Sequence, residues 1–423
     1  MPDPRHIPTF DHRLQGRCDA PASKSATHRA LVLAALSDGV SFIEKPLDAE
    51  DSQVTREGLG LLGIRSKIVD DGWEVYGTGG RIPGGANIEL RESGTSCRFL
   101  TAVAALGQRP SRLDGAPRLR QRPLAALTEA LTALGARCES DGGDGLPLRI
   151  GGAPLRGRRI ALPASPSSQF VSALLMIGGL LPDGLHLTLA RPWVSRGYVD
   201  MTMEMLESCG ADVERSGTVF QVAPGALSPR RWVVEGDYSS ASYFLAAGAI
   251  LGTIQVDGLR QDSHQPDAVL LDVLRQMGCT VDHHDETVRV VSPNRLKAIE
   301  RDLTDAPDVA PTVAALAIFA EGETRLTGLG HLRVKESDRL HALADNLTRM
   351  GVTARVEGDA LSIHSRSDRV HGAVIETRGD HRIAMAFAIA GLRIPGVVLD
   401  DGDCVAKSYP GFWRALSGLL ELE

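Results

Sequence analysis

The 423-residue sequence lacks the patterns that identify several common classes of protein. Its six cysteines are scattered and form no C-x-x-C pair, so neither a disulfide framework nor a cysteine zinc site is expected. No apolar run reaches the roughly 18 residues that a membrane helix needs. The N-terminus carries Asp3, Arg5, His6 and Asp11 in place of a signal peptide's apolar stretch. We therefore expect a cytoplasmic protein with free thiols and no membrane partner.

Motifs for metals and nucleotide cofactors are also missing. There is no H-E-x-x-H, and His283-His284 between Asp282 and Asp285 is typical of a polar turn. No G-x-G-x-x-G follows a strand, and no G-x-x-x-x-G-K-[ST] occurs. The net charge of −7 argues against a general nucleic-acid binder. The sequence predicts no metal, no cofactor and no nucleic-acid partner.

What the sequence has instead is a pattern that recurs six times. In each copy a polar or charged cluster opens a helix of small apolar residues, and a glycine follows the helix. These glycines lie 68 to 77 residues apart, at Gly39, Gly107, Gly184, Gly252, Gly322 and Gly396. A fixed period of this length indicates a repeat architecture.

A second, amphipathic type of helix alternates with the first. Each copy ends at a glycine that leads into a strand, at Gly63, Gly135, Gly210, Gly278 and Gly351. Glycine at this position adopts the left-handed conformation that terminates a helix. Segments such as 218–222 and 287–291 alternate as strands do. Each repeat therefore combines a buried helix, an amphipathic helix and several short strands, which is an α/β (α+β) composition.

Six such repeats at this length favour two globular halves of three repeats each. The best internal boundary lies near residues 230–235, after Pro224-Gly225 and Pro229. Residues 1–19 precede the first buried helix and could complete the sheet of the second half. We expect a discontinuous domain I, residues 1–19 with 235–423, and a domain II, residues 20–234, around a hinged cleft.

Several of the helix openings carry cations. Lys24 and Arg29, with the hydroxyls of Ser23 and Ser25, surround one helix N-terminus, where free N–H groups and the helix dipole suit anions. Alone, this cluster could equally be an N-cap with exposed cations. Cations at the openings of repeats one, two and six together favour a ligand with two anionic groups.

The segment 333–339, Arg-Val-Lys-Glu-Ser-Asp-Arg, is the densest polar motif. Alone it favours a solvated charged turn. The functional interpretation places Lys335 and Arg339 at helical i,i+4 spacing, with Glu336 available as acid or base. Ser167-Ser168-Gln169 alone is typical of plain N-capping.

With these motifs in this order, residues 21–410 closely resemble the 5-enolpyruvylshikimate-3-phosphate synthases (3-phosphoshikimate 1-carboxyvinyltransferases). The resemblance rests on Pro21 to Ser25, Ser93-Gly94-Thr95 with Arg98, Arg118 to Pro123, Ser167 to Phe170, Ser195 with Tyr198 to Asp200, Pro307-Asp308, Arg333 to Arg339, Asp380-His381-Arg382 and Ala406-Lys407. It implies two similar domains, each of three βαβαββ repeats, that close on their substrates. It also implies transfer of the enolpyruvyl group of phosphoenolpyruvate to the 5-hydroxyl of shikimate 3-phosphate, with release of phosphate, in chorismate and aromatic amino acid biosynthesis.

The resemblance assigns roles to individual residues. The shikimate 3-phosphate ligands would be Lys24, Ser25, Arg29, Ser167, Ser168, Ser195, Tyr198, Asp308, His331 and Lys335. The phosphoenolpyruvate ligands would be Lys24, Gly94, Arg122, Gln169, Arg339, Arg382 and Lys407. Asp308 is the best candidate to accept the hydroxyl proton, and Glu336 and Lys24 are candidates to protonate the methylene carbon. Neither cofactor nor metal is implied, and we expect a monomer.

The chain departs from the family pattern at a few positions. His331 stands where asparagine often binds the shikimate phosphate, so phosphate affinity could depend on pH. Glu92 and Ser93 stand where Asn-Ala is common, and the Glu92 carboxylate would be repulsive unless Arg98 or Arg122 pairs with it. Phe99 and Gly197 replace common prolines. Gly94 leaves room near the phosphoenolpyruvate phosphate, from which we expect glyphosate sensitivity.

Two other functions stay open at this point. The related transferases that act on UDP-N-acetylglucosamine carry a cysteine in the loop before their Arg-Pro pair, whereas this loop is Gly115-Ala116-Pro117-Arg118. A non-catalytic anion-binding repeat protein is a different class, against which Lys24, Asp308, Glu336 and Arg382 argue together.

Overall fold

The computed structural model describes residues 4–141, 143, 145–164, 167–191 and 193–421. The chain forms two compact units, which we call unit 1 (Met1–Pro21 with Glu235–Glu423) and unit 2 (Ala22–Val234). The segments expected from the sequence, 1–19 with 235–423 and 20–234, differ from these units at residues 20 and 21. Each unit has its own hydrophobic core.

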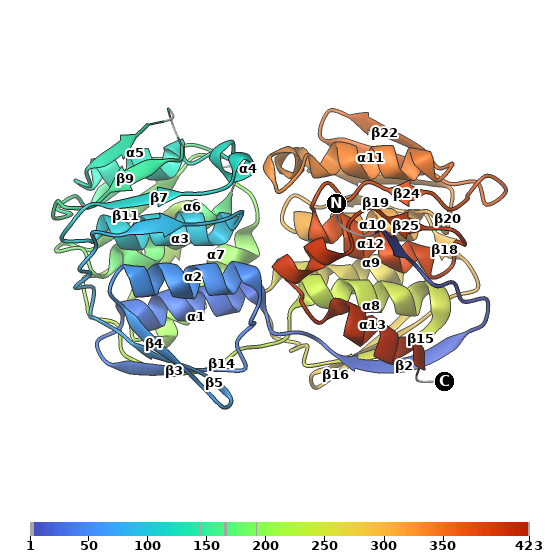
Figure 1. Cartoon of the computed structure of the whole chain (residues 1–423), viewed down its shortest axis with the longest axis horizontal. Helices are drawn as coiled ribbons and strands as arrows, with labels where there is room; N and C mark the ends of the chain where they lie inside the picture. Colours follow the sequence, from blue (N-terminus) through green and yellow to red (C-terminus); the bar gives the residue numbers. More distant parts are fainter. Residues whose placement is uncertain (1–3, 142, 144, 165–166, 192, 422–423) are drawn as a thin grey trace. The chain divides into compact units, whose positions relative to one another are not determined.

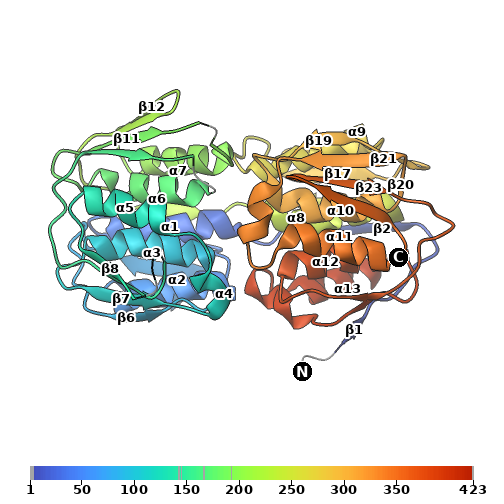
Figure 2. The same cartoon turned by 90° about the horizontal axis from the view of Figure 1, so that it is seen from above.

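Unit 2 consists of interior helices, outer helices and small sheets (Figures 1 and 2). Its interior helices are α1 (Lys24–Leu36), α3 (Gly94–Ala105) and α6 (Ser168–Gly178). Its other helices are α2 (Glu50–Leu61), α4 (Pro117–Arg120), α5 (Ala125–Ala133) and α7 (Arg196–Ser208). The interior helices contact one another, and nearly all of their residues are buried.

Each sheet of unit 2 is four-stranded in the part of the chain that the structure describes. The first has the order β14 (Arg231–Val233), β3 (Val40–Glu44), β5 (Gly72–Tyr76), β4 (Arg65–Val69). The second has the order β6 (Asn87–Glu89), β7 (Ser111–Asp114), β9 (Leu148–Ile150), β8 (Cys138–Ser140). The third has the order β10 (Arg159–Leu162), β11 (Leu185–Leu189), β13 (Val219–Val222), β12 (Val213–Ser216). In all of them the first pair is parallel and the other pairs are antiparallel, which is the βαβαββ connection.

Unit 1 repeats this plan (Figure 1). Its interior helices are α8 (Tyr238–Leu251), α10 (Ala310–Ala317) and α12 (His381–Gly391), and its outer helices are α9 (Leu270–Gln276), α11 (Arg339–Arg349) and α13 (Phe412–Glu421). Short 3₁₀ turns are η1 (Pro266–Val269), η2 (Pro307–Val309), η3 (Gly330–Val334) and η4 (Asp403–Lys407).

Two sheets of unit 1 follow the same order of strands, and the third is three-stranded in the described chain. The first is β2 (Leu14–Asp19), β15 (Gly252–Asp257), β17 (Thr287–Val291), β16 (Thr280–His284). The second is β19 (Glu300–Asp302), β21 (Glu323–Thr327), β23 (Ala360–His364), β22 (Thr353–Glu357), and β18 (Leu296–Lys297) pairs with β20 (Ala320–Glu321). The third is β24 (Val374–Ile375), β25 (Val398–Leu399), β1 (Arg5–His6). Since β2 runs parallel to β15, the N-terminal segment completes a sheet of unit 1.

Local chemistry explains where these helices begin and end. The side chains of Ser23, Ser93, Ser167, Asp237 and Asp380 each accept a hydrogen bond from a backbone N–H of the turn that they open. The outer helices end at glycines with positive φ: Gly63, Gly135, Gly210, Gly278 and Gly351. These glycines adopt the left-handed conformation expected from the sequence.

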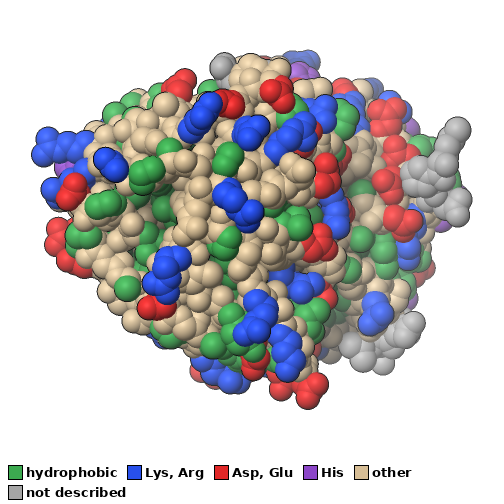
Figure 3. Space-filling view, turned by 60° about the vertical axis from the view of Figure 1, so that its left-hand side comes forward, with side chains coloured by type: hydrophobic (Ala, Val, Ile, Leu, Met, Phe, Trp, Pro, Cys, Tyr) green, Lys and Arg blue, Asp and Glu red, His purple; other side chains and the backbone are tan. Residues whose placement is uncertain are grey.

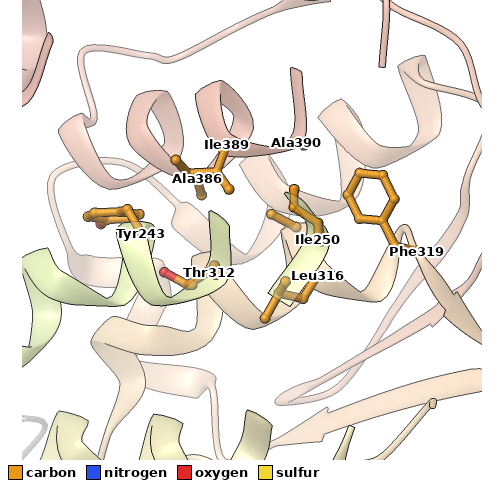
Figure 4. Close-up of a pocket in the computed structure, with 10 residues that line it drawn as sticks. Tyr243, Ile250, Thr312, Leu316, Phe319, Ala386, Ile389 and Ala390 are labelled. Carbon is orange, nitrogen blue, oxygen red and sulfur yellow. The ribbon is translucent and has the colours of Figure 1, made fainter. Parts of the chain in front are cut away.

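The centre of unit 1 is apolar. Between α8, α10 and α12 lies a small gap lined by Tyr243, Ile250, Leu316 and Ile389, among others (Figure 4). Apart from the hydroxyls of Tyr243 and Thr312, the side chains that line it are apolar, so we assign it to packing. Among the described helices, none is long and apolar enough to cross a membrane. The six cysteines are free thiols.

Candidate active site

In unit 1 the predicted site residues gather around Asp308, which lies in η2 before α10. The Asp308 carboxylate is 3.1 Å from Arg339 Nη1, 3.1 Å from Arg382 Nη2 and 3.5 Å from Lys335 Nζ. Lys335 directly follows η3 and Arg339 begins α11, whereas Arg382 lies in α12, far from both in the sequence. The fold therefore brings the charged openings of repeats five and six together.

Arg339 is the centre of this cluster and is 1% exposed. Its Nε and Nη2 donate to Asp380 at 2.9 and 3.1 Å, and Nη2 also donates to Glu336 at 2.9 Å. Burial alone would lower the pKa of Arg339, but Asp380, Glu336 and Asp308 raise it above its ordinary value. A guanidinium held by these carboxylates is fixed in both position and charge.

A further cation of unit 1, Lys407, belongs to the same cluster. Lys407, in η4, lies 4.0 Å from Glu336, and both side chains are nearly buried. The cluster thus contains four cations (Lys335, Arg339, Arg382, Lys407) and three carboxylates (Asp308, Glu336, Asp380). With one net positive charge in a low-dielectric setting, it favours an anionic ligand.

His331 lies beside this cluster, in η3. Burial and the charge of Lys335 lower its pKa to about 4, although Asp308 and Asp359 act in the opposite direction. Its Nε2 is buried, and no described residue hydrogen-bonds to that atom. Because the imidazole is neutral near pH 7, the pH dependence expected from its protonation falls near pH 4.

In unit 2 a second cluster surrounds the N-termini of α1 and α3. Lys24, in the first turn of α1, pairs with Asp51 of α2 at 3.1 Å, and both side chains are largely buried. A buried ammonium of this kind is held in place by its carboxylate and needs little reorganisation to meet an anion.

Arg29 lies one turn further along α1 and is 2% exposed. Its guanidinium donates to the Ser25 carbonyl, Thr202 Oγ1, Ser172 Oγ and the Tyr198 carbonyl, at 2.7 to 3.1 Å. Burial lowers its pKa to about 10, which leaves it charged at neutral pH. Its described bonds are made to neutral oxygens, so it contributes positive charge to the region.

Gly94 and Arg122 lie in direct contact at the start of α3. A Cβ atom added at Gly94 would lie 2.5 Å from the Arg122 guanidinium. The space expected beside this glycine is therefore filled by Arg122. The neighbouring Arg98 donates to the carbonyls of Gly94 and Pro123 at 3.0 Å, and Glu92 is exposed.

The serines and Gln169 occupy helix starts. Ser167 caps α6, Ser168 is its first residue, and the Gln169 amide donates to Thr95 Oγ1 at 3.0 Å. Ser195 precedes α7 in a left-handed conformation, with φ of 56°, and is 7% exposed. Such a backbone costs energy in a residue other than glycine, and residues of this kind are frequent at functional sites.

The structure therefore places the predicted residues in two clusters, one in each unit. Asp308, His331, Lys335, Glu336, Arg339, Arg382 and Lys407 belong to unit 1, and Lys24, Ser25, Arg29, Gly94, Arg122, Ser167, Ser168, Gln169, Ser195 and Tyr198 belong to unit 2. The sequence analysis gave no role to Asp51 or Asp380, which hold Lys24 and Arg339. Asp380 stood in a recognised motif, whereas nothing near Asp51 in the sequence indicated its partner. No three His, Cys, Asp or Glu side chains among the described residues are grouped as metal ligands are.

Comparison with known proteins identifies the family. The family model described as EPSP synthase (3-phosphoshikimate 1-carboxyvinyltransferase) matches residues 9–416. The chain belongs to the EPSP synthase family. Among curated EPSP synthase relatives, the 3-phosphoshikimate 1-carboxyvinyltransferase of Methanosphaerula palustris is 42% identical over 409 residues, 95% of this chain and 96% of that protein. The enzyme of the same name from Aeropyrum pernix is 42% identical over 417 residues, 98% of this chain and 96% of that protein.

Solved EPSP synthase structures share the fold. That of Acinetobacter baumannii has a TM-score of 0.81 at 28% identity, over 98% of this chain and 97% of that chain. The predicted family, enzyme class and fold are therefore confirmed. A transferase for UDP-N-acetylglucosamine is not favoured by these matches to EPSP synthases.

Proposed function

We propose that this chain transfers the enolpyruvyl group of phosphoenolpyruvate to the 5-hydroxyl of shikimate 3-phosphate and releases inorganic phosphate. The relatives named for that activity match this chain over nearly their whole length. The observation that supports the proposal most directly is the cluster around Asp308, where three cations converge on one carboxylate.

We assign phosphoenolpyruvate to the most cationic groups. Arg339, Arg382 and Lys407 of unit 1, and Lys24 and Arg122 of unit 2, bind its phosphate and carboxylate. Gly94 and Gln169 complete this set. Arg339 and Arg382 are already paired with carboxylates, so an incoming anion takes over some of their N–H donors. Planar guanidinium groups suit this exchange because one fork can hold two oxygen atoms.

We assign shikimate 3-phosphate to the hydroxyl-rich groups. Ser25, Ser167, Ser168 and Ser195 offer hydroxyl donors at helix starts, where backbone N–H groups also point outward. Arg29, Tyr198, His331, Lys335 and Asp308 complete this set, and Lys24 contacts both substrates. Neutral His331 still provides one donor.

The chemistry moves one proton off the hydroxyl and one onto carbon. As the 5-hydroxyl oxygen attacks C2 of phosphoenolpyruvate, Asp308 accepts its proton, and the Lys24 ammonium, or Glu336 in its protonated form, delivers a proton to C3. The tetrahedral centre then loses phosphate together with a proton from C3, which restores the double bond. The arginines stabilise the charge that develops on the phosphate and carboxylate oxygens.

Asp308 fits the role of base because its cations keep its carboxylate ionised and fixed. The same cations oppose its protonation, so the proton must leave it again quickly. Binding of two anionic substrates draws these cations away from Asp308 and makes it a stronger base. In this way substrate binding prepares the base.

The test is phosphate release from phosphoenolpyruvate with shikimate 3-phosphate, in parallel with UDP-N-acetylglucosamine as acceptor. We expect release with the former alone. Lys24→Ala should abolish most turnover, whereas Lys67→Ala, at an exposed strand position of the same unit, should not. No release with shikimate 3-phosphate would overturn the function, and a fully active Lys24→Ala would overturn the site assignment.

We further propose a monomer that acts in the cytoplasm without nucleic-acid or membrane partners. Each unit closes its own core, and the six free thiols suit a reducing compartment. On the face drawn in Figure 3, basic and acidic side chains are interspersed. Size-exclusion chromatography with light scattering tests the monomer. Glyphosate should inhibit turnover, and full activity at millimolar glyphosate would contradict that expectation.

A further inference from the structure

A chain of polar side chains runs through the interior of unit 2, next to the Lys24–Asp51 pair. His28 of α1 has its Nδ1 2.7 Å from Thr55 Oγ1 of α2, and Thr55 Oγ1 is 2.8 Å from Ser96 Oγ of α3. All three residues are 0% exposed. Buried polar groups are costly unless they are hydrogen-bonded, so such a chain contributes to stability only in one fixed arrangement.

The donor and the acceptor of each hydrogen bond in this network can be assigned by starting at Ser96. Ser96 Oγ is 3.0 Å from the Asp51 carbonyl, which can only accept, so the Ser96 proton lies there. Thr55 must then donate to Ser96, and its own oxygen must accept from His28. His28 therefore carries its proton on Nδ1. Ser93 adds a donor to the second lone pair of Ser96, at 2.7 Å.

The surroundings of the other ring nitrogen, Nε2, agree with this tautomer. No described residue hydrogen-bonds to His28 Nε2, which is buried. With the proton on Nδ1, that atom is an unpaired acceptor, which proteins tolerate better than an orphaned N–H. Burial lowers the pKa of His28 to about 3, so the ring is neutral. Its edge packs against the Phe99 ring, with 6.4 Å between the ring centroids.

The His28–Thr55 hydrogen bond links α1 to α2, as the Lys24–Asp51 pair also does. Lys24 and His28 are four residues apart on α1, and their partners Asp51 and Thr55 are four residues apart on α2. Residues at this spacing lie on one face of a helix, one turn apart. The His28 link thus fixes the register of the two helices one turn below the Lys24 ammonium.

Ser96 extends the same network to a third helix. It lies two residues after Gly94, in the first turn of α3, and Ser93 caps that turn. A shift of α1 along α2, or of α3 against either, would break at least one bond of the chain. The network therefore links the position of Lys24 to that of Gly94 and the Arg122 guanidinium packed on it.

We propose that His28 is a positioning residue for the enolpyruvyl transfer, which through the hydroxyls of Thr55 and Ser96 holds Lys24 and the start of α3 in register. The proposal rests on the proposed function, because Lys24 and Gly94 are assigned to phosphoenolpyruvate there. His28 touches neither substrate in this assignment and acts through the helices.

The first test compares two matched variants. Thr55→Val removes a buried hydroxyl of the chain, and Thr101→Val removes an equally buried hydroxyl of α3 that bonds to the Cys97 carbonyl of its own helix. We expect Thr55→Val to lower kcat/KM for phosphoenolpyruvate about 10- to 100-fold more than Thr101→Val, as small misplacements of reacting groups do. Equal losses in the two variants would overturn the proposal.

The second test is rescue at His28 itself. His28→Leu cannot donate to Thr55, whereas the amide nitrogen of His28→Asn takes nearly the place of Nδ1. We expect the asparagine variant to recover most of the kcat/KM lost in the leucine variant. If the leucine and asparagine variants had equal activity and similar melting temperatures, a positioning role for His28 would be refuted.

The third test does not depend on turnover. In ¹⁵N-labelled wild-type protein, ring nitrogen shifts at pH 7 should show His28 protonated on Nδ1 and unprotonated on Nε2. The opposite tautomer would overturn the inference even if the valine variants fail to fold. If the wild-type chain shows this tautomer and releases no phosphate, the network stands and the proposed function fails.

Discussion

Gly94 is a residue whose missing side chain has a definite consequence. A Cβ added at this position would lie 2.5 Å from three atoms of the Arg122 guanidinium. We expect Gly94→Ala to push Arg122 away and to raise KM for phosphoenolpyruvate about tenfold or more, since a hydrogen bond to a charged group contributes ~1.5–3 kcal/mol. Gly60→Ala is the control, because its Cβ would meet no described atom within 4 Å. Steady-state kinetics with both substrates measure the effect, and an unchanged KM would show that Arg122 does not bind this substrate.

A second prediction about a single residue concerns His331 and the pH dependence of stability. Its pKa is about 4 in the folded chain, against 6.5 for the ordinary group. The unfolded state therefore binds the proton first as the pH falls below 6.5, so stability is lost progressively between pH 6.5 and 4, the full loss persists below pH 4, and the residue has no such effect above 6.5. At pH 5 the loss is ~2 kcal/mol by the pKa difference. Urea unfolding at pH 7 and 5 should show a loss ~2 kcal/mol larger in wild type than in His331→Asn, because His28, whose pKa burial also lowers, contributes its own loss to both proteins. Parallel losses would place the folded pKa near its ordinary value.

At the scale of elements, the helix starts of unit 1 differ in what they carry. Asp380 caps α12 and also holds the buried Arg339, whereas Asp272 in the first turn of α9 pairs with the exposed Arg275. Asparagine at position 380 keeps a capping oxygen and removes the charge. We expect Asp380→Asn to cost ~3–5 kcal/mol in stability, as breaking a buried ion pair does, and to lower activity strongly. Asp272→Asn should be much milder, because exposed ion pairs contribute little to stability. Thermal unfolding and kcat of the two variants decide, and equal costs would show that the Asp380 charge does not support Arg339.

The same elements show how far sequence reasoning extends. Buried helices, their caps and the glycines that stop the outer helices follow local rules, and the structure has them at the expected residues. The partners of the site cations do not follow local rules. Asp51 is 27 residues from Lys24 and Asp380 is 41 from Arg339, so only the packing of repeats brings them together. Asp308 was expected as a base, but its surrounding cations could not be derived from spacing.

At the scale of the whole molecule, each unit completes its sheets with strands from a distant part of the chain. In unit 2, β14 pairs with β3 from the other end of the same segment. In unit 1, β2 pairs in parallel with β15 along six residues, from Gly252↔Leu14 to Asp257↔Asp19. The two segments therefore differ in whether they contain all of their own strands.

Residues 22–234 contain every strand of the sheets of unit 2 in the described chain, whereas residues 235–423 lack β2 and β1. Without β2, the edge of β15 would leave backbone groups unpaired and the site of buried Leu14 empty. We expect the fragment 22–234 to unfold cooperatively on heating and the fragment 235–423 not to fold. A permuted chain, 235–423 joined through a flexible linker to 1–21, is the matched control and should regain cooperative unfolding. Circular dichroism melts distinguish these outcomes. A well-folded 235–423 fragment would mean that β2 is dispensable, and a permuted chain that stays unfolded would mean that unit 1 depends on more than its missing strands.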